Sequence, residues 1–352
     1  MCKTPLHDFL KRLPKAEHHL HLEGALSPTL LFELAKRNNI SLPTEDSAFN
    51  SPDSLQSRYG RFTSLDDFLH YYYFGMSVLI HAHDFEALAW DYFQHASADG
   101  VHHAEVFFDP QAHTTRGVSY NTVLSGFESA CRRAERELGI TTELITCFLR
   151  HLPVEDCLAT FENEHVQQSY RSGAVKGIGL DSSEVGFPPH LFSEIYEKAR
   201  KQGLRRTAHA GGEGPVDFIA SALDTLGIER IDHGIRLADD ADLMAKVAAQ
   251  GTLLTTCPIS NVVLGSVPSI QDLPIRKFLD AGVRFSINSD DPAYFGRYIL
   301  DNYCSVQESF DLDVQEWGSI SRAGIEGSWC GDGRKREILT ALEELMKEWQ
   351  EL

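Results

Sequence analysis

The stretch AEHHLHLEG, residues 16–24, begins with a predicted strand at 16–21 and ends in a cluster of ionisable side chains. Seven further short runs of β type follow it, at residues 101–108, 142–149, 175–180, 206–209, 230–232, 253–256 and 283–288. Amphipathic helical stretches lie between them, at residues 123–138, 191–201, 216–226, 240–249 and 275–281. This alternation predicts parallel pairing through right-handed crossovers. Eight strands are the number that a closed (β/α)8 barrel needs.

The polar residues at the strand ends favour the barrel over an open, doubly wound sheet. Ionisable clusters follow the first, fifth, sixth and eighth predicted strands. An open sheet gathers ligands only at its switch point, whereas a barrel brings the carboxyl ends of all strands to one mouth. We therefore expect an α/β fold, a (β/α)8 TIM barrel with extra helices that forms a single domain over residues 1–352. Residues 42–61, rich in Ser, Pro, Asp and Asn, are expected to be a surface insertion, and residues 338–352 a closing helix.

Composition narrows the class of partner. The 352 residues include 32 Lys and Arg against 51 Asp and Glu, a formal net charge of −19. Such a chain repels polyanions on average, so nucleic acid and anionic membranes are not expected as partners. The start of the chain lacks the pattern of a signal peptide, and no apolar run approaches the ~18 residues of a membrane span. We expect a cytoplasmic protein that acts on a small molecule, and a nuclear location is left open. The oligomeric state is left open.

Three imidazoles and one carboxylate are candidate metal ligands. His19 and His21 alternate along the first strand and so share one face of it. His209 and Asp290 follow the fifth and eighth strands. An isolated H-x-H is more often a solvated strand end, but four such groups at separate strand ends indicate a site. Nitrogen and oxygen ligands with one open position are typical of catalytic zinc, although iron and manganese also accept this set.

The same motifs resemble those of a known family. HLHLEG at residues 19–24 resembles the opening motif of the adenosine/adenine deaminase family of metal-dependent amidohydrolases, which have (β/α)8 barrels. HAG at 209–211, DHG at 232–234, CPISN at 257–261 and SDDP at 289–292 match its later motifs in order. The resemblance covers residues 14 to about 295. The adenine deaminase branch is the closer match, through FFDPQ at 107–111, GLDSSE at 179–184 and Glu23.

The resemblance implies a zinc-dependent aminohydrolase that converts adenine and water to hypoxanthine and ammonia. One Zn²⁺ per chain would be held by His19, His21, His209 and Asp290, and would lower the pKa of its water so that hydroxide attacks C6. His233 would orient that water and handle its proton. The implied substrate contacts are Asp291 at a ring nitrogen such as N7, Gly179, Asp181 and Glu184 at the opposite edge, and Glu23 in the space that a ribose would fill.

One position departs from the family pattern. The resemblance implies a Glu three residues after His209, which protonates the ring nitrogen N1, but this chain has Gly212 there. Glu213 is the next residue, and it replaces the missing acid only if the glycine-rich turn swings its carboxylate inward. Otherwise Glu213 is solvated or bound to a nearby backbone amide.

Three functions are therefore open. The chain is an adenine deaminase in which Glu213 or a water relay compensates for Gly212, or a related metal hydrolase with a changed substrate. The third is a zinc- and purine-binding protein without deaminase turnover. Restoring the carboxylate at position 212 distinguishes among them.

Overall fold

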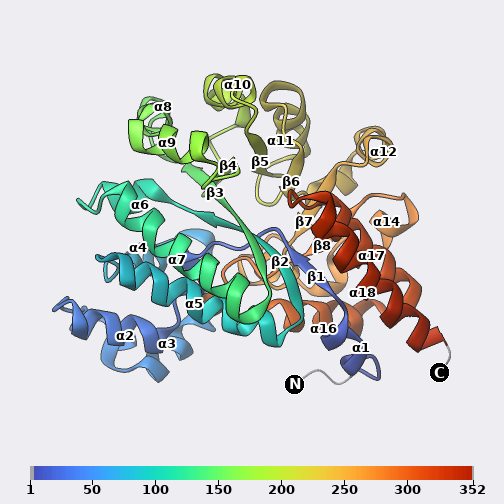
Figure 1. Ribbon diagram of the computed structural model, residues 1–352, viewed down its shortest axis with the longest axis horizontal. Coiled ribbons are helices and arrows are strands. Elements are labelled where there is room, and N and C mark those ends of the chain that lie inside the picture. Colours follow the sequence, from blue (N-terminus) through green and yellow to red (C-terminus); the bar gives the residue numbers. More distant parts are fainter. Residues whose placement is uncertain (1–3, 351–352) are drawn as a thin grey trace.

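The computed structural model describes residues 4–350, and within this range eight parallel strands form one sheet in chain order (Figure 1). The strands are β1 (Lys15–Glu17), β2 (Val101–Phe108), β3 (Thr141–Leu149), β4 (Gly177–Asp181), β5 (Arg205–Ala210), β6 (Arg230–His233), β7 (Leu253–Thr256) and β8 (Phe285–Ile287). Each strand pairs with the next in parallel, and the chain next to β1 also bridges the chain next to β8. The predicted (β/α)8 barrel is confirmed, and all eight predicted runs contain a strand.

The first strand is shorter than expected, because side chains replace part of its ladder. β1 ends at Glu17, whereas the predicted strand continued to residue 21. The side-chain oxygen of Asn288 accepts the N–H of His18 at 2.8 Å, and Glu17 Oε1 accepts the N–H of Ser289 at 3.0 Å. Beyond this gap, Leu20 pairs with Asp290 as an isolated bridge. Side chains and single bridges therefore close the seam between β1 and β8.

Helices surround the sheet. The α-helices are α1 (His7–Arg12), α2 (Pro28–Arg37), α3 (Pro52–Tyr59), α4 (Leu65–Met76), α5 (Ala82–Ala98), α6 (Pro110–Thr114), α7 (Tyr120–Leu138), α8 (Val154–Glu162), α9 (Glu164–Ser172), α10 (Ser193–Lys201), α11 (Val216–Ser221), α12 (Ala241–Gln250), α13 (Pro258–Val263), α14 (Ile275–Asp280), α15 (Pro292–Phe295), α16 (Ile299–Phe310), α17 (Val314–Gly327) and α18 (Asp332–Gln350). The 3-10 turns are η1 (Glu23–Ala25), η2 (Ser47–Asn50), η3 (Pro189–Phe192), η5 (Ile235–Asp239) and η6 (Ile270–Asp272), and η4 (Ala222–Leu226) is π-helical.

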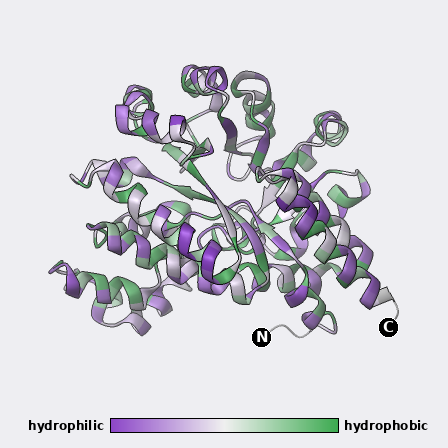
Figure 2. Cartoon of the chain, viewed as in Figure 1, coloured by the Kyte–Doolittle hydropathy of each residue, from purple (hydrophilic) through white to green (hydrophobic). Residues whose placement is uncertain are grey.

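The helices are amphipathic, as the predicted stretches require. In α7, Ser119 caps the first turn through its side chain, and Val123, Phe127 and Ala130 are buried at helical spacing. Figure 2 shows hydrophilic and hydrophobic residues intermixed along the peripheral helices. The apolar stripe of each helix packs towards the sheet and holds the barrel together. Among the helices of residues 4–350, none is both long and apolar enough to cross a bilayer.

Residues 42–61 are more ordered than a loose surface excursion. They contain η2 and α3, and the side chain of Ser51 caps α3 by accepting the N–H of Ser54. Leu55 and Tyr59 are buried, and the Tyr59 ring stacks on Tyr294 with 4.6 Å between centroids. Packing of these apolar residues on α15 orders the segment. That it is an insertion stays a prediction.

The two ends of the described chain pack at the base of the barrel. Helix α18 buries Ile338 and Leu342 and packs beside α17, as expected of a closing helix, and residues 351–352 of the predicted helix lie outside the described residues. Lys15 at the start of β1 is fully buried and donates to the carbonyls of Leu10 and Leu13. Burial lowers the pKa of Lys15 to about 7.

Candidate active site and metal centre

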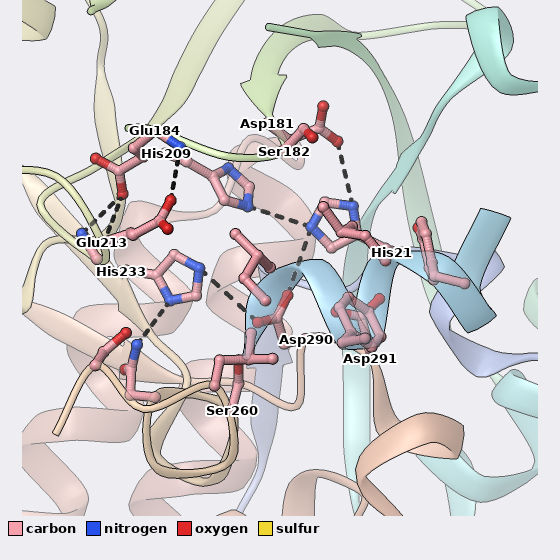
Figure 3. Close-up of a pocket in the computed structure, with 18 of the residues that line it drawn as sticks. His21, Asp181, Ser182, Glu184, His209, Glu213, His233, Ser260, Asp290 and Asp291 are labelled. Atoms are coloured by element: carbon pink, nitrogen blue, oxygen red, sulfur yellow. Dashed lines mark hydrogen bonds and ion pairs between the residues drawn. The ribbon is translucent and has the colours of Figure 1, made fainter. Parts of the chain in front are cut away.

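The four predicted metal ligands lie together at the carboxyl end of the barrel. One ligand atom from each of His19, His21, His209 and Asp290 lies within 4.8 Å of the others. His21 Nε2 is 3.3 Å from His209 Nε2, and Asp290 Oδ1 is 3.2 Å from His19 Nε2 and 3.5 Å from His21 Nε2. Figure 3 shows His21, His209 and Asp290 pointing towards one another. Donors about 2.0–2.2 Å from a tetrahedral zinc are about 3.3–3.6 Å apart, so this spacing fits one ion.

The charge states of Asp290 and His209 suit a cation, whereas burial of His19 is outweighed by the attraction of Asp290, which raises the pKa of His19. Burial opposes ionisation of Asp290, but the imidazoles of His19, His233 and His21 outweigh it and hold the pKa of Asp290 well below its usual range. Burial and the same neighbouring rings lower the pKa of His209 well below its usual value. The set therefore offers an ionised carboxylate and a neutral imidazole, the forms that bind metals.

A second layer of oxygens faces the other nitrogen of each imidazole. The pairs are His19 Nδ1 with Thr255 Oγ1 at 2.9 Å, His21 Nδ1 with Asp181 Oδ2 at 3.5 Å, and His209 Nδ1 with Asp232 Oδ2 at 3.6 Å. Such partners fix the ring orientation and tautomer of metal-binding histidines. Thr255 Oγ donates to Asp232 Oδ1 at 2.9 Å. Its oxygen is then the acceptor for His19 Nδ1–H, which leaves the Nε2 lone pair of His19 free.

Sequence reasoning missed these supporting groups. Asp232 stood in the motif at 232–234, but nothing in that motif showed that its carboxylate faces His209. Thr255 is an ordinary strand residue in the sequence, and its role depends on β7 lying beside β6.

Arg150 is a further group that the sequence did not single out. It follows β3 and is fully buried, and its Nη1 donates to the carbonyl of His209 at 2.8 Å. Its Nε donates to the carbonyl of Phe187 at 2.9 Å. The guanidinium therefore ties the ends of β3 and β5 to the loop after β4, and it positions the backbone of a candidate ligand.

Two residues at the site have a left-handed backbone. His233 has φ 62° and Asp290 has φ 64°, a region that residues other than glycine rarely adopt. Such strain is concentrated at functional sites, where the surrounding structure holds it in place.

His233 lies beside the candidate ligands. Its Nε2 is 3.8 Å from Asp290 Oδ2, and its Nδ1 is 3.3 Å from Asn261 Nδ2. Burial lowers the pKa of His233 to about 4, so the ring is neutral at pH 7. Because the Asn261 amide donates to Nδ1, the proton of the ring sits on Nε2, on the side of the candidate metal ligands.

A cavity of about 420 Å³ opens over the cluster. Helix α4 covers one side of it with aromatic rings, and the strand ends supply polar groups. The residues that line the cavity include Phe68, Tyr72, Tyr73, Asp109, Asp181, Glu184, Gly212, Glu213, His233, Ser260, Asn261, Asp290 and Asp291.

Hydrogen bonds in both directions join the turn after β5 to the loop after β4. The Glu184 carboxylate accepts the N–H groups of Gly211, Gly212 and Glu213 at 2.9–3.0 Å. In return, Glu213 Oε2 accepts the N–H of Glu184 at 2.9 Å (Figure 3). It also accepts the hydroxyl of Ser183 at 3.1 Å. The predicted acid Glu213 is thus bound to a backbone amide, which was the alternative expected for a carboxylate that does not swing inward.

The predicted substrate contacts divide into two groups. Asp181, Glu184 and Asp291 line the cavity, and Asp291, although it precedes α15, makes no side-chain cap to that helix. Gly179 and Glu23 do not line it. A Cβ at Gly179 would lie 2.5 Å from Cys147 Sγ, so this glycine permits close packing inside the barrel.

Glu23 lies behind the cavity wall, because the η1 turn points its side chain into the protein. Its Oε1 accepts the N–H of Asp109 at 3.1 Å and faces His113 Nε2 at 2.8 Å. The structure thus places Glu23 outside the cavity lining, where its contact orders Asp109, and its role in the space of a ribose stays a prediction.

Comparisons with known proteins agree with this geometry. A family model described as adenosine deaminase matches residues 14–345. An adenine deaminase of Aspergillus oryzae is 59% identical over 344 residues, 98% of this chain and 97% of that protein. The crystal structure of adenine deaminase from Arthrobacter aurescens has a TM-score of 0.89 and 42% identity, and covers 95% of this chain and 99% of that one. An amidohydrolase from Burkhoderia ambifaria, solved with bound Zn, has a TM-score of 0.87 and 27% identity. The match covers 99% of this chain and 96% of that one.

Proposed function

Because the chain belongs to the adenosine deaminase family, we propose that it is a hydrolase of C–N bonds that deaminates adenine to hypoxanthine and ammonia, with one Zn²⁺ per chain. The observation that carries this proposal is the convergence of three imidazoles and one carboxylate at the floor of a cavity. The relatives named adenine deaminase, which match nearly the whole chain, support the choice of substrate. The substrate is a small purine base, and neither a nucleic acid nor a membrane is part of the proposal.

The residues that would hold the ion are His19, His21, His209 and Asp290. Three of the distances between their donor atoms are 3.2–3.5 Å, which fits the coordination sphere of zinc, and all four atoms lie within 4.8 Å of one another. When bound, a divalent metal lowers the pKa of water and so supplies a nucleophile at neutral pH.

The chain's own residues orient the reactants and move protons. His233 is neutral, and its Nε2 faces Asp290, so the ring is placed to hold and pass on a proton beside the reacting carbon. Asp291 presents a carboxyl group to the cavity, and burial together with neighbouring carboxylates raises its pKa well above the usual value. A protonated Asp291 donates a hydrogen bond to a ring nitrogen such as N7. Phe68 and Tyr72 cover the cavity from α4 and limit access of water.

A second candidate function follows from Gly212. The carboxylates nearest to this glycine are Glu184 and Glu213, and the hydrogen bonds above hold both on backbone amides. These bonds turn both carboxylates towards backbone amides, so neither is arranged as a proton donor to N1. This favours slow turnover of adenine, or a substrate that needs no ring protonation.

The experiment is an assay of the purified, metal-analysed chain with adenine, in which hypoxanthine is followed by chromatography and ammonia by a coupled assay. We expect stoichiometric release of both products, loss of activity on chelation, and recovery when Zn²⁺ is returned. Metal-loaded protein that releases no ammonia from adenine, but does so from another aminoheterocycle, would favour the second candidate.

A further inference from the structure

Asp109 lines the cavity, and its side chain does not cap the helix that follows it. It precedes α6 at the N-cap position, where an aspartate ordinarily accepts a backbone N–H of the first turn, yet its side chain makes no cap. Asp240, which precedes α12, shows the usual arrangement and accepts the N–H groups of Asp242 and Leu243. The Asp109 side chain is therefore directed elsewhere.

The carboxyl group of Asp109 is buried against the cavity. The residue is 1% exposed, and its Oδ1 has no hydrogen-bond partner among residues 4–350. Two further cavity residues on this side, Tyr72 and Asp181, also have a buried oxygen without a partner. A buried polar atom left unpaired costs about 1–3 kcal/mol, so a polar ligand that pairs these atoms stabilises the complex.

Asp109 lies beside one support of the metal cluster, because its carboxyl group is a hydrogen-bonding neighbour of the Asp181 carboxyl group. Asp181 Oδ2 faces His21 Nδ1, so Asp181 supports a candidate ligand. One ligand atom from each of His21, Asp109 and Asp181 lies within 4.8 Å of the others, but among residues 4–350 no hydrogen bond or ion pair joins the Asp109 carboxylate to the four candidate ligands. The backbone N–H of Asp109 is fixed by the buried Glu23, which sets the position of this carboxyl group.

We propose that Asp109 is a specificity residue that accepts the ring N–H of an unsubstituted purine, and so selects a free base over an N9-substituted one. The inference rests on the proposed function, since it names which form of the purine the cavity accepts. A free base carries an N–H on its imidazole ring, and a nucleoside carries carbon at that nitrogen. A carboxylate accepts this N–H, and a neutral carboxyl group accepts it through its C=O, so either form recognises the free base. An N9-substituted purine leaves Asp109 buried and unpaired.

The test is calorimetric binding of hypoxanthine and 9-methylhypoxanthine, two non-reacting probes, to the metal-loaded full chain. We expect the wild-type chain to bind hypoxanthine about 10- to 100-fold more tightly, the range for a hydrogen bond to a charged group. Asp109→Leu keeps the shape of the side chain and removes its acceptor. It should therefore weaken the binding of hypoxanthine by this factor and leave the affinity for 9-methylhypoxanthine unchanged. Asp109→Asn retains a neutral acceptor, so its affinity for hypoxanthine should fall about fivefold.

Controls separate this inference from its alternatives. Asp240→Asn, a matched change at another N-cap, should leave the ratio of the two affinities unchanged. Metal content is measured for every variant, and loss of metal from Asp109→Asn would show that Asp109 supports the metal cluster and overturn the inference. Equal affinity of the wild type for both bases, binding of neither, or an unchanged ratio in the variants would also overturn it. Selective binding by a wild-type chain that does not deaminate adenine would count against the proposed function only.

Discussion

Replacing Gly212 by glutamate tests how the missing carboxylate limits turnover. Gly212 lines the cavity, and its φ is not in the left-handed region, so its backbone accepts a side chain. A Cβ there would lie 3.0–3.1 Å from three side-chain atoms of His233, namely Cβ and the ring atoms Cγ and Cδ2. The new side chain would thus run past His233, provided that this ring moves by a few tenths of an ångström.

The substitution should change two quantities, the rate of adenine turnover and the stability of the fold. A positioned general acid contributes about 10²–10⁴-fold to rate, so Gly212→Glu should raise kcat/KM for adenine by about this factor. The crowding against His233 resembles overpacking of a core and should lower the free energy of unfolding by about 1–3 kcal/mol. A gain in rate together with a modest loss of stability is therefore expected.

The assay is steady-state hypoxanthine formation at pH 7 with equal metal content, together with urea unfolding. Gly212→Gln is the matched control, because it crowds His233 equally and carries no carboxylic acid. We expect the Glu variant alone to gain activity and both variants to lose similar stability. An equal gain in the Gln variant, or a folded and metal-loaded Glu variant without any gain, would refute the reasoning.

Three further predictions concern groups around the site and the base of the barrel. Asp232→Asn removes the carboxylate that faces His209 and should weaken metal binding about 10- to 100-fold, measured by competition with a chromophoric chelator. Arg150→Met removes the donor to the buried carbonyl of His209 and to the partly buried carbonyl of Phe187, and should lower the free energy of unfolding by about 2 kcal/mol, measured by urea denaturation. Lys15 has an ordinary pKa of 10.5 and a folded value of about 7, so the unfolded chain binds more protons between these values. The free energy of unfolding of the wild type, relative to that of Lys15→Met, should therefore fall as pH falls from about 10 to 7. A difference between the two proteins that does not change over this pH range would contradict the lowered pKa of Lys15.

The barrel and the candidate ligands could be predicted because strand order fixes where strand ends lie. His19, His209 and Asp290 are remote in sequence, yet each lies at or next to the carboxyl end of a strand, and a closed parallel barrel brings those ends together. This reasoning needs only the alternation of elements and the residue types at their ends. It does not require any knowledge of side-chain contacts.

The remaining details depend on side-chain packing that no local pattern encodes. Glu23 belongs to the first motif, but the η1 turn points it behind the wall towards His113. The contact of Arg150 with the carbonyl of His209 joins residues 59 positions apart. Glu213 is adjacent to the position of the expected acid, and the reciprocal bonds with Glu184 decide where its carboxylate goes.

Anomalous diffraction at the zinc edge, on crystals of the chain grown with Zn²⁺, tests whether the four candidate ligands bind one metal ion. We expect one peak about 2.0–2.2 Å from the Nε2 atoms of His19, His21 and His209 and from Asp290 Oδ1. A zinc-loaded crystal without a peak among these four atoms, or with its ion bound elsewhere, would contradict this expectation.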